Sequence, residues 1–505
     1  MIRRLRHNVA VLDAANGLLC GTQIYLSRIL RFELMRAAVL AAYIIPALLV
    51  FALSFADLAS LLALLEIDLA RSQGEAIHAT LYGQSLASVG LPALQLKLFT
   101  QSDPRPKVRV LHYMGTNFGM TGVETFILQL TAAQKRRGLT PSILMDLHNR
   151  QDVREIAGGY GIAVHDLPDR NSAARLLPWK LGTAVLRAQR IGAIYRLLKS
   201  NDVLHIQAVG LSCLDGFIAA AMAGADVVVT HHGTLSWFAP QRDLLAEITF
   251  WIEKRTASTI VMPYKAALAE LISEGVPADR SRVIPFCVDE ELFAEGRHAA
   301  SQSGFTLVLV ARMVLGKGHL ELLWALSKLS PRYPQLRAMF IGDGPTRGQI
   351  EGEIDRLGLR QIVECRGKVD HREVPALMRS AQVIVLPTYE PGEMYPVSLL
   401  EGMALGLPAI GTRWAGIPDI IDDGVTGVIV EPKDEASLVR AIERFVADPS
   451  FLAQSRDGAL ARIRSRFTAT IVADSYADLY REAMSSRTPY LTSHHIRIRP
   501  PRCLA

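Results

Sequence analysis

Short runs of β-branched and aliphatic residues alternate with helical segments from about residue 107 almost to the end of this 505-residue chain. The first run, KVRVLHYMG, leads into a glycine-bearing loop and then into an apolar-periodic helix that Gly138 closes. Strands that alternate with helices in this way form a parallel, doubly wound sheet. The later runs predicted as strands are PSILMDL, DVLHIQAV, DVVVTHHG, STIVMPY, SRVIPF, FTLVLVARMV, LRAMFIGDG, IVECRGKV, QVIVLPTY, PAIGTRW and TGVIVEP.

A polar stretch, residues 295–304, divides this pattern into two sets of strands. Two such sheets joined by a linker predict two Rossmann-like domains that face one another. Open sheets of this kind bind ligands at the carboxyl ends of their strands, so a cleft between the domains is the expected site. We therefore expect an N-terminal hydrophobic and basic segment at 1–106, Rossmann-like domains at 107–300 and 301–465, a helix at 466–488 that packs back toward the first domain, and a basic tail at 489–505.

The overall composition excludes several classes of protein. Five scattered cysteines show no paired spacing, so neither a zinc site nor a disulfide framework is indicated, and a reducing compartment fits best. A formal net charge of +6 favours an anionic partner somewhere, but it does not mark a nucleic-acid binder. We expect no nucleic-acid partner.

One hydrophobic stretch, residues 37–67, suggests contact with a membrane. Its first twenty residues carry no charge, which is enough to cross a bilayer as a helix, and arginines precede it. A single crossing with the N-terminus inside would place all later residues outside. Because Pro46 lies in the middle of the run, a kinked or re-entrant helical pair remains open, as does a buried helix of a soluble core.

Two cations and a glycine-rich loop could hold an anionic group. Arg312 follows a predicted strand directly and Lys317 lies in the next loop, so both should point out of the top of the sheet, although they could equally be solvated surface cations. In the loop GTNFGMTG, Gly119 and Gly122 let the backbone approach a ligand at a helix N-terminus. Turn chemistry alone is the alternative for these glycines.

Two glutamates, Glu393 and Glu401, stand eight positions apart in EPGEMYPVSLLEGMALGLP. Pro396 can begin a helix as its first residue, which would put Glu401 about two turns into that helix and Glu393 in the loop before it. A carboxylate that faces a pocket suits a polyol, because it can accept hydrogen bonds from two vicinal hydroxyls. One carboxylate could then hold a hexose and the other a ribose.

In this motif and in several others, the chain resembles the retaining glycosyltransferases of family 4, which have the two-domain GT-B architecture. The Glu, seven residues, Glu spacing of Glu393 and Glu401 matches the family signature. Further matches in the family order, covering about residues 107 to 480, are MGTNFGMTGVETF, VVVTHHG, VIPFCVDEELF, VARMVLGKG, FIGDGP and GVTGVIVEP. The resemblance implies a first domain that binds the acceptor and a second that binds a nucleotide-sugar donor.

The resemblance also implies a role for each matching residue. Arg312 and Lys317 would bind the donor diphosphate and stabilise its developing charge, as preorganised charges do in catalysis. Glu401 would hold the ribose, and Glu393 the transferred sugar. The remaining donor contacts would come from Gly119 and Gly122 near the phosphates, Gly367 and Val369 at the base, and Tyr395 and Val397.

A histidine of the first domain, His232, would face the reacting sugar. Its neighbour His231 is the rival, but alternation along a strand puts the two on opposite sides and the family has its histidine next to the glycine. His205 is better explained as a buried strand histidine. The chain departs from the family at three positions. Gln207 stands where histidine is frequent, and Cys287 and Met394 stand where glycine is common.

The family precedent is transfer with retention of anomeric configuration. No carboxylate is placed as a covalent nucleophile, so front-face displacement is the working hypothesis. The sequence has no Asp-x-Asp motif and no Cys/His cluster, and we expect a metal-independent enzyme without a cofactor.

Together these features predict a hexosyltransferase that moves sugar from a nucleotide-diphosphate sugar to a glycan or lipid-linked acceptor in cell-surface polysaccharide synthesis. Because nucleotide sugars are cytoplasmic in bacteria, we expect the enzyme on the cytoplasmic face of the inner membrane, anchored through residues 37–67. Five cations on the predicted helix 176–200 could contact anionic lipids, or form a solvated face. A GT-B nucleotide-sugar epimerase or hydrolase, or an inactive membrane-bound scaffold, are the alternatives.

Overall fold

The computed structural model describes residues 108–115, 122–147, 151–168, 179–208, 213–233, 244–294 and 304–485. Both sheets belong to one compact unit, whose described residues run from Val108 to Leu167 and from Ala193 to Ser485. Pro168 and residues 179–192 belong to a second unit. The hydrophobic stretch 37–67 and the basic tail 489–505 lie outside the described residues.

The first sheet contains seven strands in the order β3-β2-β1-β4-β5-β6-β7, and every neighbouring pair is parallel. This order begins in the middle of the sheet, runs to one edge, and returns to the middle to build the other half. The strands are β1 (Arg109–Met114), β2 (Thr140–Met145), β3 (Ala163–Asp166), β4 (Val203–Ala208), β5 (Asp226–His231), β6 (Thr259–Met262) and β7 (Ser281–Val283).

The second sheet repeats the plan with six parallel strands in the order β10-β9-β8-β11-β12-β13. The prediction of two Rossmann-like domains with parallel sheets is thus confirmed. The strands of the second sheet are β8 (Phe305–Val310), β9 (Leu336–Ile341), β10 (Val363–Gly367), β11 (Val383–Leu386), β12 (Ala409–Thr412) and β13 (Gly427–Val430).

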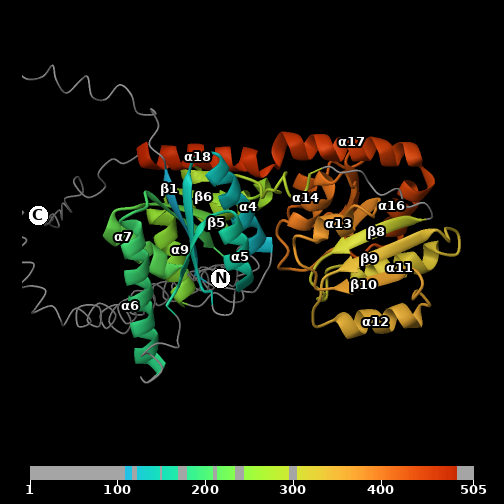
Figure 1. Cartoon of the computed structure of the whole chain (residues 1–505), viewed down its shortest axis with the longest axis horizontal. Helices are drawn as coiled ribbons and strands as arrows, with labels where there is room; N and C mark the ends of the chain where they lie inside the picture. The colour runs from blue at the N-terminus through green and yellow to red at the C-terminus, as the bar shows by residue number, and fades with distance from the viewer. Residues whose placement is uncertain are drawn as a thin grey trace, which may run out of the picture. The chain divides into compact units, whose positions relative to one another are not determined.

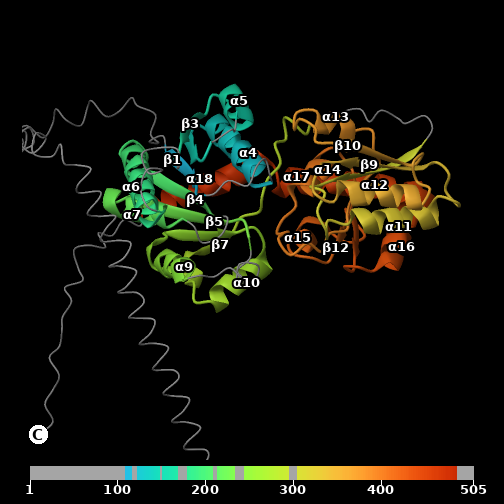
Figure 2. The same cartoon turned by 90° about the horizontal axis from the view of Figure 1, so that it is seen from below.

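Helices connect the strands, as Figures 1 and 2 show. In the first domain they are α4 (Gly122–Arg136), α5 (Gln151–Gly159), α6 (Trp179–Leu198), α7 (Leu214–Ala223), α9 (Leu244–Thr256), α10 (Lys265–Ser273) and the 3₁₀ turn η5 (Ala278–Arg280). The later ones are α11 (His319–Leu329), α12 (Arg347–Arg356), α13 (Val374–Met378), α14 (Val397–Ala404), α15 (Ile417–Ile420), α16 (Glu435–Ala447), α17 (Pro449–Arg466) and α18 (Ala469–Ser485).

Local sequence explains where several helices begin and end. Asp434 caps α16 by accepting a hydrogen bond from the backbone N–H of Ser437 at 3.0 Å. Asp448 caps α17, whose first residue is a proline that has no N–H to leave unpaired. Gly138, at φ 85°, follows α4, because only glycine adopts this left-handed conformation without strain. These residues fix the boundaries of the connecting helices.

The last helix, α18, packs on the first domain, against α4 and strand β5. The chain returns beside the linker that follows β7, and Val288 and Thr468 form a parallel β-bridge there. Backbone hydrogen bonds of 2.9 Å join Val288 to Phe467 and to Ala469. The final helix is therefore tied to the linker between the two sheets.

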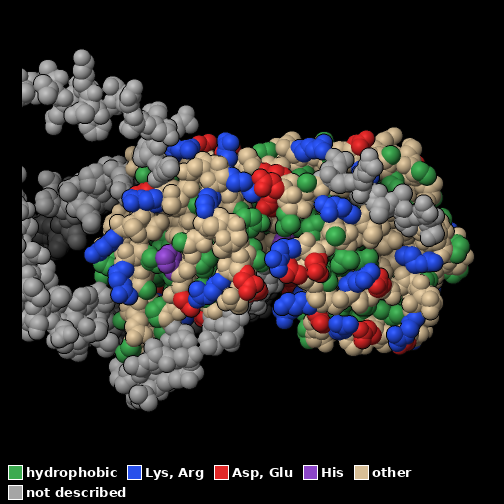
Figure 3. All heavy atoms as spheres, in the orientation of Figure 1, with side chains coloured by type: hydrophobic (Ala, Val, Ile, Leu, Met, Phe, Trp, Pro, Cys, Tyr) green, Lys and Arg blue, Asp and Glu red, His purple; other side chains and the backbone are tan. Residues whose placement is uncertain are grey.

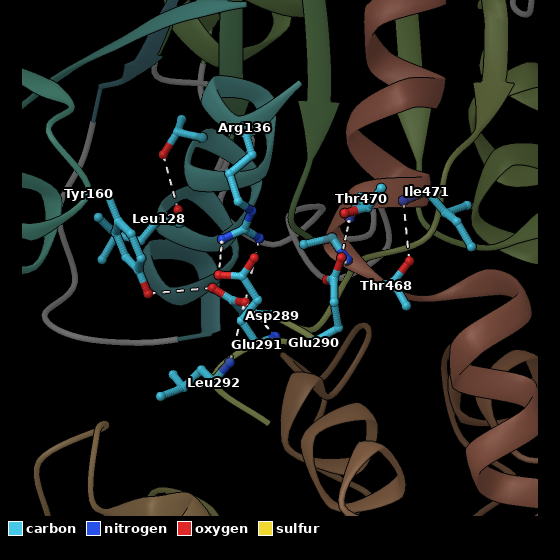
Figure 4. A network of polar contacts seen from close by, with 12 residues as sticks. Leu128, Arg136, Tyr160, Asp289, Glu290, Glu291, Leu292, Thr468, Thr470 and Ile471 are labelled. Carbon is cyan, nitrogen blue, oxygen red and sulfur yellow. Dashed lines mark hydrogen bonds and ion pairs between the residues drawn. The ribbon is translucent and has the colours of Figure 1, made fainter. Parts of the chain in front are cut away.

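Acidic side chains of the linker strengthen this junction, as Figure 4 shows. The carboxylate of Glu290 accepts hydrogen bonds from the backbone N–H groups of Ala469, at 2.8 Å, and Thr470, at 3.2 Å, at the start of α18. The buried Asp289 lies 3.5 Å from the guanidinium of Arg136 on α4. The linker thus holds both α4 and α18.

No helix among the described residues is long and apolar enough to cross a membrane. The predicted membrane segment lies outside these residues, and so it stays a prediction. The helix predicted at 176–200 appears as α6, which begins at Trp179 and ends at Leu198.

Replacing Glu290 by alanine should lower the free energy of unfolding by about 1 to 2 kcal/mol, because two N–H groups of the first turn of α18 lose a charged acceptor. Glu291 is the matched control. Its side chain is 68% exposed and contacts Arg136 at 3.2 Å, so Glu291→Ala should change stability by less than about 0.5 kcal/mol. Urea unfolding of both variants measures the difference, and equal losses would contradict the capping role.

Candidate functional site

Each sheet has one point where the strand order reverses, between β1 and β4 in the first sheet and between β8 and β11 in the second. Loops at the carboxyl ends of such strands diverge and leave room for a ligand. Arg312 follows β8 by two residues, and Lys317 lies five residues further along. Glu393 follows β11, in the loop that leads to α14. Three of the predicted site residues therefore lie at the reversal point of the second sheet.

Lys317 lies between two carboxylates. Its ammonium donates a hydrogen bond to Glu393 Oε2 at 2.7 Å and lies 3.4 Å from Glu390 Oε2. Burial of Lys317 disfavours its charged form, but the two carboxylates favour that form more strongly, Glu393 above all, so the pKa is raised above its usual value. Lys317 is therefore charged at neutral pH.

The direct pairing of Lys317 with Glu393 bears on the roles that the resemblance implies. Lys317 pairs directly with Glu393, whereas the family resemblance assigns the two side chains to different parts of a donor. A diphosphate could compete with the carboxylates for the ammonium, and a sugar hydroxyl could then donate to the released carboxylate. Arg312 is exposed at the same reversal point and is not part of this ion-pair group.

Glu401 is buried in α14, with 5% of its surface exposed. Its Oε1 lies 3.8 Å from Nε2 of His371, a residue in the loop after β10. Burial raises the pKa of Glu401, and the nearby His371 opposes that shift only in part. Keeping a carboxylate here disfavours the folded state unless a hydroxyl-bearing ligand donates hydrogen bonds to it.

The start of α14 differs from the prediction. Pro396 is the residue before the helix, with extended backbone angles of φ −71° and ψ 107°, and Val397 is the first helical residue. Glu401 consequently lies little more than one turn into the helix, and the prediction of about two turns was wrong. The proline still ends the preceding loop.

The remaining predicted donor contacts lie on several different elements. Val397 is buried at the start of α14, and a Cβ on Gly122 would lie 3.9 Å from its Cγ2. The first turns of α4 and α14 are thus brought together. Gly367 ends β10 with φ 70°, and the half-buried Val369 follows it. Gly119 lies outside the described residues.

Tyr395 connects this loop to the first domain. Its ring stacks with Tyr264 at 6.3 Å between centroids and meets Phe286 edge-on at 5.5 Å. Phe286 in turn packs on the ring of His232 at 4.9 Å. These aromatic contacts place His232 one side chain away from the loop that carries Glu393.

The two adjacent histidines have different partners. His232 Nε2 contacts Gln207 Oε1 at 2.7 Å, and burial lowers the pKa of His232 to about 3. His231 Nε2 contacts the buried Glu253 at 2.5 Å on α9. His205 is fully buried in β4. His231 thus bonds to a buried acid and His232 to a neutral amide, and Nδ1 of each ring has no hydrogen-bond partner among the described residues.

Sequence reasoning missed three residues of this region. Glu390 shares Lys317 with Glu393, and it stands in the same quoted motif, so the cluster of acids there was the available signal. His371 beside Glu401 had no signal, because its loop follows a different strand. Gln207 was noted as a departure from the family, but its contact with His232 depends on the alignment of β4 with β5.

The described residues contain no group of three or more histidine, cysteine, aspartate or glutamate side chains placed to hold a metal ion. On the face seen in Figure 3, basic and acidic side chains are interspersed. That face carries no continuous basic stripe of the kind that follows a nucleic-acid backbone.

Two Rossmann-like domains with parallel sheets form the GT-B architecture. The family model for glycosyl transferases group 1 matches residues 293–461, and the model for glycosyltransferase family 4 matches residues 120–292. The chain therefore belongs to the family 4 glycosyltransferases. The resemblance noted from the sequence is confirmed for the family, and the retaining mode of transfer stays a prediction.

Similar proteins include several sugar transferases. A phosphatidylinositol N-acetylglucosaminyltransferase component from Arabidopsis thaliana is 26% identical over 348 residues, which are 68% of this chain and 75% of the relative. The alpha-D-kanosaminyltransferase of Streptomyces kanamyceticus is 24% identical over 321 residues, 60% of this chain and 83% of the relative.

A solved structure agrees with the fold. The Anabaena protein Alr3699/HepE in complex with UDP has a TM-score of 0.62 and 19% identity, covering 74% of this chain and 100% of that one. The same protein has been solved with UDP-glucose, and that structure aligns with a TM-score of 0.62 at 18% identity.

Glu401→Gln should make the protein more stable at neutral pH, because a neutral amide replaces a buried carboxylate. A raised pKa means that the folded wild type keeps its full stability below the ordinary glutamate pKa. It loses stability relative to Glu401→Gln as the pH rises through the folded-state pKa. Urea unfolding at pH 4 and pH 7.5 measures this, and a variant less stable than wild type at pH 7.5 would contradict it.

Proposed function

We propose that the protein is a retaining hexosyltransferase that takes its sugar from a nucleotide-diphosphate donor. The observation that carries the proposal is Lys317, a half-buried cation held between Glu393 and Glu390 at the reversal point of the second sheet. Complexes of the structural relative Alr3699/HepE with UDP and with UDP-glucose support this class of donor. Its sugar need not be the one used here.

In the proposed reaction, Lys317 and Arg312 stabilise the negative charge that develops on the departing diphosphate. The bond between the anomeric carbon and the phosphate oxygen breaks. An acceptor hydroxyl then forms its bond to that carbon from the same face, and its proton passes to the leaving phosphate. Glu393 orients the sugar, Glu401 binds the ribose, and His232 faces the sugar from the first domain. No metal takes part in this scheme.

The proposed acceptor is a glycan or a lipid-linked sugar used in cell-surface polysaccharide synthesis. The uncharged stretch within residues 37–67 supports a place at the cytoplasmic face of the inner membrane, because nucleotide sugars are found in that compartment. Protease treatment of oriented vesicles checks the location: cleavage of the second domain only from the periplasmic side would contradict it.

Donor turnover by the purified full-length protein tests the proposal. With UDP, GDP and ADP sugars and an extracted lipid acceptor, one donor class should be consumed with transfer of its sugar, and the product should keep the anomeric configuration by NMR. Lys317→Ala should lower turnover by about a hundredfold or more, because one preorganised charge is lost. EDTA should leave turnover unchanged.

Lys328→Ala is the matched control, because Lys328 is another lysine of the second domain, but it lies on α11 against Trp324. This variant should keep wild-type turnover. Release of free sugar with no transfer to any acceptor would replace the proposal with a hydrolase. Failure of every donor to bind would indicate an inactive scaffold.

A further inference from the structure

A continuous chain of buried hydrogen bonds runs from His232 through the core of the first domain to α18. His232 contacts Gln207, and the amide nitrogen of Gln207 lies 3.0 Å from Nδ1 of His112. His112 Nε2 contacts Gln134 Oε1 at 2.8 Å. The amide nitrogen of Gln134 then donates to the hydroxyl of Tyr480 at 3.0 Å. These side chains come from β1, α4, β4, α18 and the residue after β5.

The chain continues beyond Tyr480. Its hydroxyl lies 2.7 Å from Nδ1 of His205, and His205 Nε2 lies 2.8 Å from the hydroxyl of Thr230. The last contact of the hydrogen-bond chain joins the hydroxyl of Thr230 to the hydroxyl of Tyr476 at 2.8 Å. All eight side chains of this buried hydrogen-bond chain are less than a tenth exposed.

The orientation assigned to the two amides sets one direction for the protons along these hydrogen bonds. Gln207 presents its oxygen to His232 and its N–H to His112, so His112 Nδ1 accepts a hydrogen bond. Gln134 presents its oxygen to the other nitrogen of His112, so that nitrogen donates. A neutral imidazole has one donor and one acceptor, and both amide orientations agree with that requirement.

The same direction extends to both ends of the chain. Because Gln134 donates to the oxygen of Tyr480, the Tyr480 hydroxyl is free to donate to His205 Nδ1. His205 Nε2 then donates to Thr230. At the other end, the Gln207 oxygen requires a proton on Nε2 of His232, which leaves a lone pair on its Nδ1.

Burial keeps these histidines neutral. It lowers the pKa of His112 to about 4 and holds the pKa of His205 well below its usual range. Neither the His112 ring nor the His205 ring bonds to a carboxylate within the buried hydrogen-bond chain. The nearby acid Glu253 pairs with His231 instead. A neutral chain is thus the stable state at physiological pH.

We propose that the buried hydrogen-bond chain fixes His232 as the tautomer with its proton on Nε2, so that Nδ1 accepts a hydrogen bond from a hydroxyl of the donor or acceptor sugar. Gln207 is then a positioning residue that acts through His232. The free Nδ1 is buried and has no hydrogen-bond partner among the described residues. The role at the sugar rests on the proposed function, whereas the tautomer rests on the orientation of the Gln207 and Gln134 amides.

The proposal explains why glutamine can stand at position 207. A side chain there must accept from His232 and donate to His112, and an amide does both. A neutral imidazole also has one donor and one acceptor, so Gln207→His can keep the direction of the chain. Leucine has neither. The substitutions Gln207→His and Gln207→Leu therefore form a matched pair.

The experiment is long-range proton–nitrogen NMR of full-length protein labelled with nitrogen-15 histidine, without any donor. The His232 signals are assigned with His232→Asn. Wild type and Gln207→His should show His232 protonated on Nε2 only. Gln207→Leu should show both tautomers, because Nε2 has lost its acceptor. If Gln207→Leu does not fold, Tyr480→Phe provides the second variant, since it removes the acceptor that orients Gln134.

Thr131→Val is the structural control. Thr131 is buried on α4 near Gln134, but among the described residues its hydroxyl bonds only to carbonyls of its own helix. This variant should keep the wild-type tautomer. A proton on Nδ1 of His232 in the wild type, or an unchanged tautomer in Gln207→Leu, would overturn the proposal.

Turnover provides the second readout. Gln207→Leu should lower kcat about tenfold, as expected for one misdirected hydrogen bond, and Gln207→His should restore it. The NMR result does not depend on any sugar, so a protein that transfers no sugar but shows the expected tautomer contradicts only the proposed function. A kcat unchanged in Gln207→Leu would contradict the role at the sugar.

Discussion

The first domain depends on a helix from the far end of the chain. A parallel sheet is stable only when helices cover both of its faces, and part of this cover comes from α18, which packs on α4 and β5. The contact is polar as well as apolar, because Tyr476 and Tyr480 donate and accept hydrogen bonds within the core. The bridge between Val288 and Thr468 holds the helix in register with the linker. The arrangement around His232 therefore depends on α18.

The polar side chains of the two domains differ in charge. The second concentrates charge, with Lys317 between two carboxylates and Glu401 buried a short distance along the same motif. The first contains a buried network of histidines, amides and hydroxyls that form hydrogen bonds with one another. A charged site stabilises a polyanionic ligand, and a neutral network orients a proton without changing the net charge. The proposed transfer of a sugar from a diphosphate donor would use both properties.

Much of the fold was predictable from the sequence, because twelve strands match the predicted runs, and most of these runs are apolar, as is typical of buried parallel strands. The strand β3 was not predicted, because Ala163–Asp166 is short and partly exposed at the sheet edge. The site residues Glu393 and Lys317 could be named from their motif, but their direct pairing needed the alignment of two loops. The contacts of Gln207 and His371 join residues from separate strands, which a single sequence does not relate.

The position of α18 has a consequence for biosynthesis. Ribosomes release the chain from its N-terminus, so strands β1 to β7 emerge before the helix that completes their cover. Until residue 480 has been translated, Gln134 and His205 lack the tyrosine hydroxyl that links them. A nascent first domain must then expose unpaired polar groups and part of its apolar face. Completion of the first domain is therefore coupled to synthesis of the second.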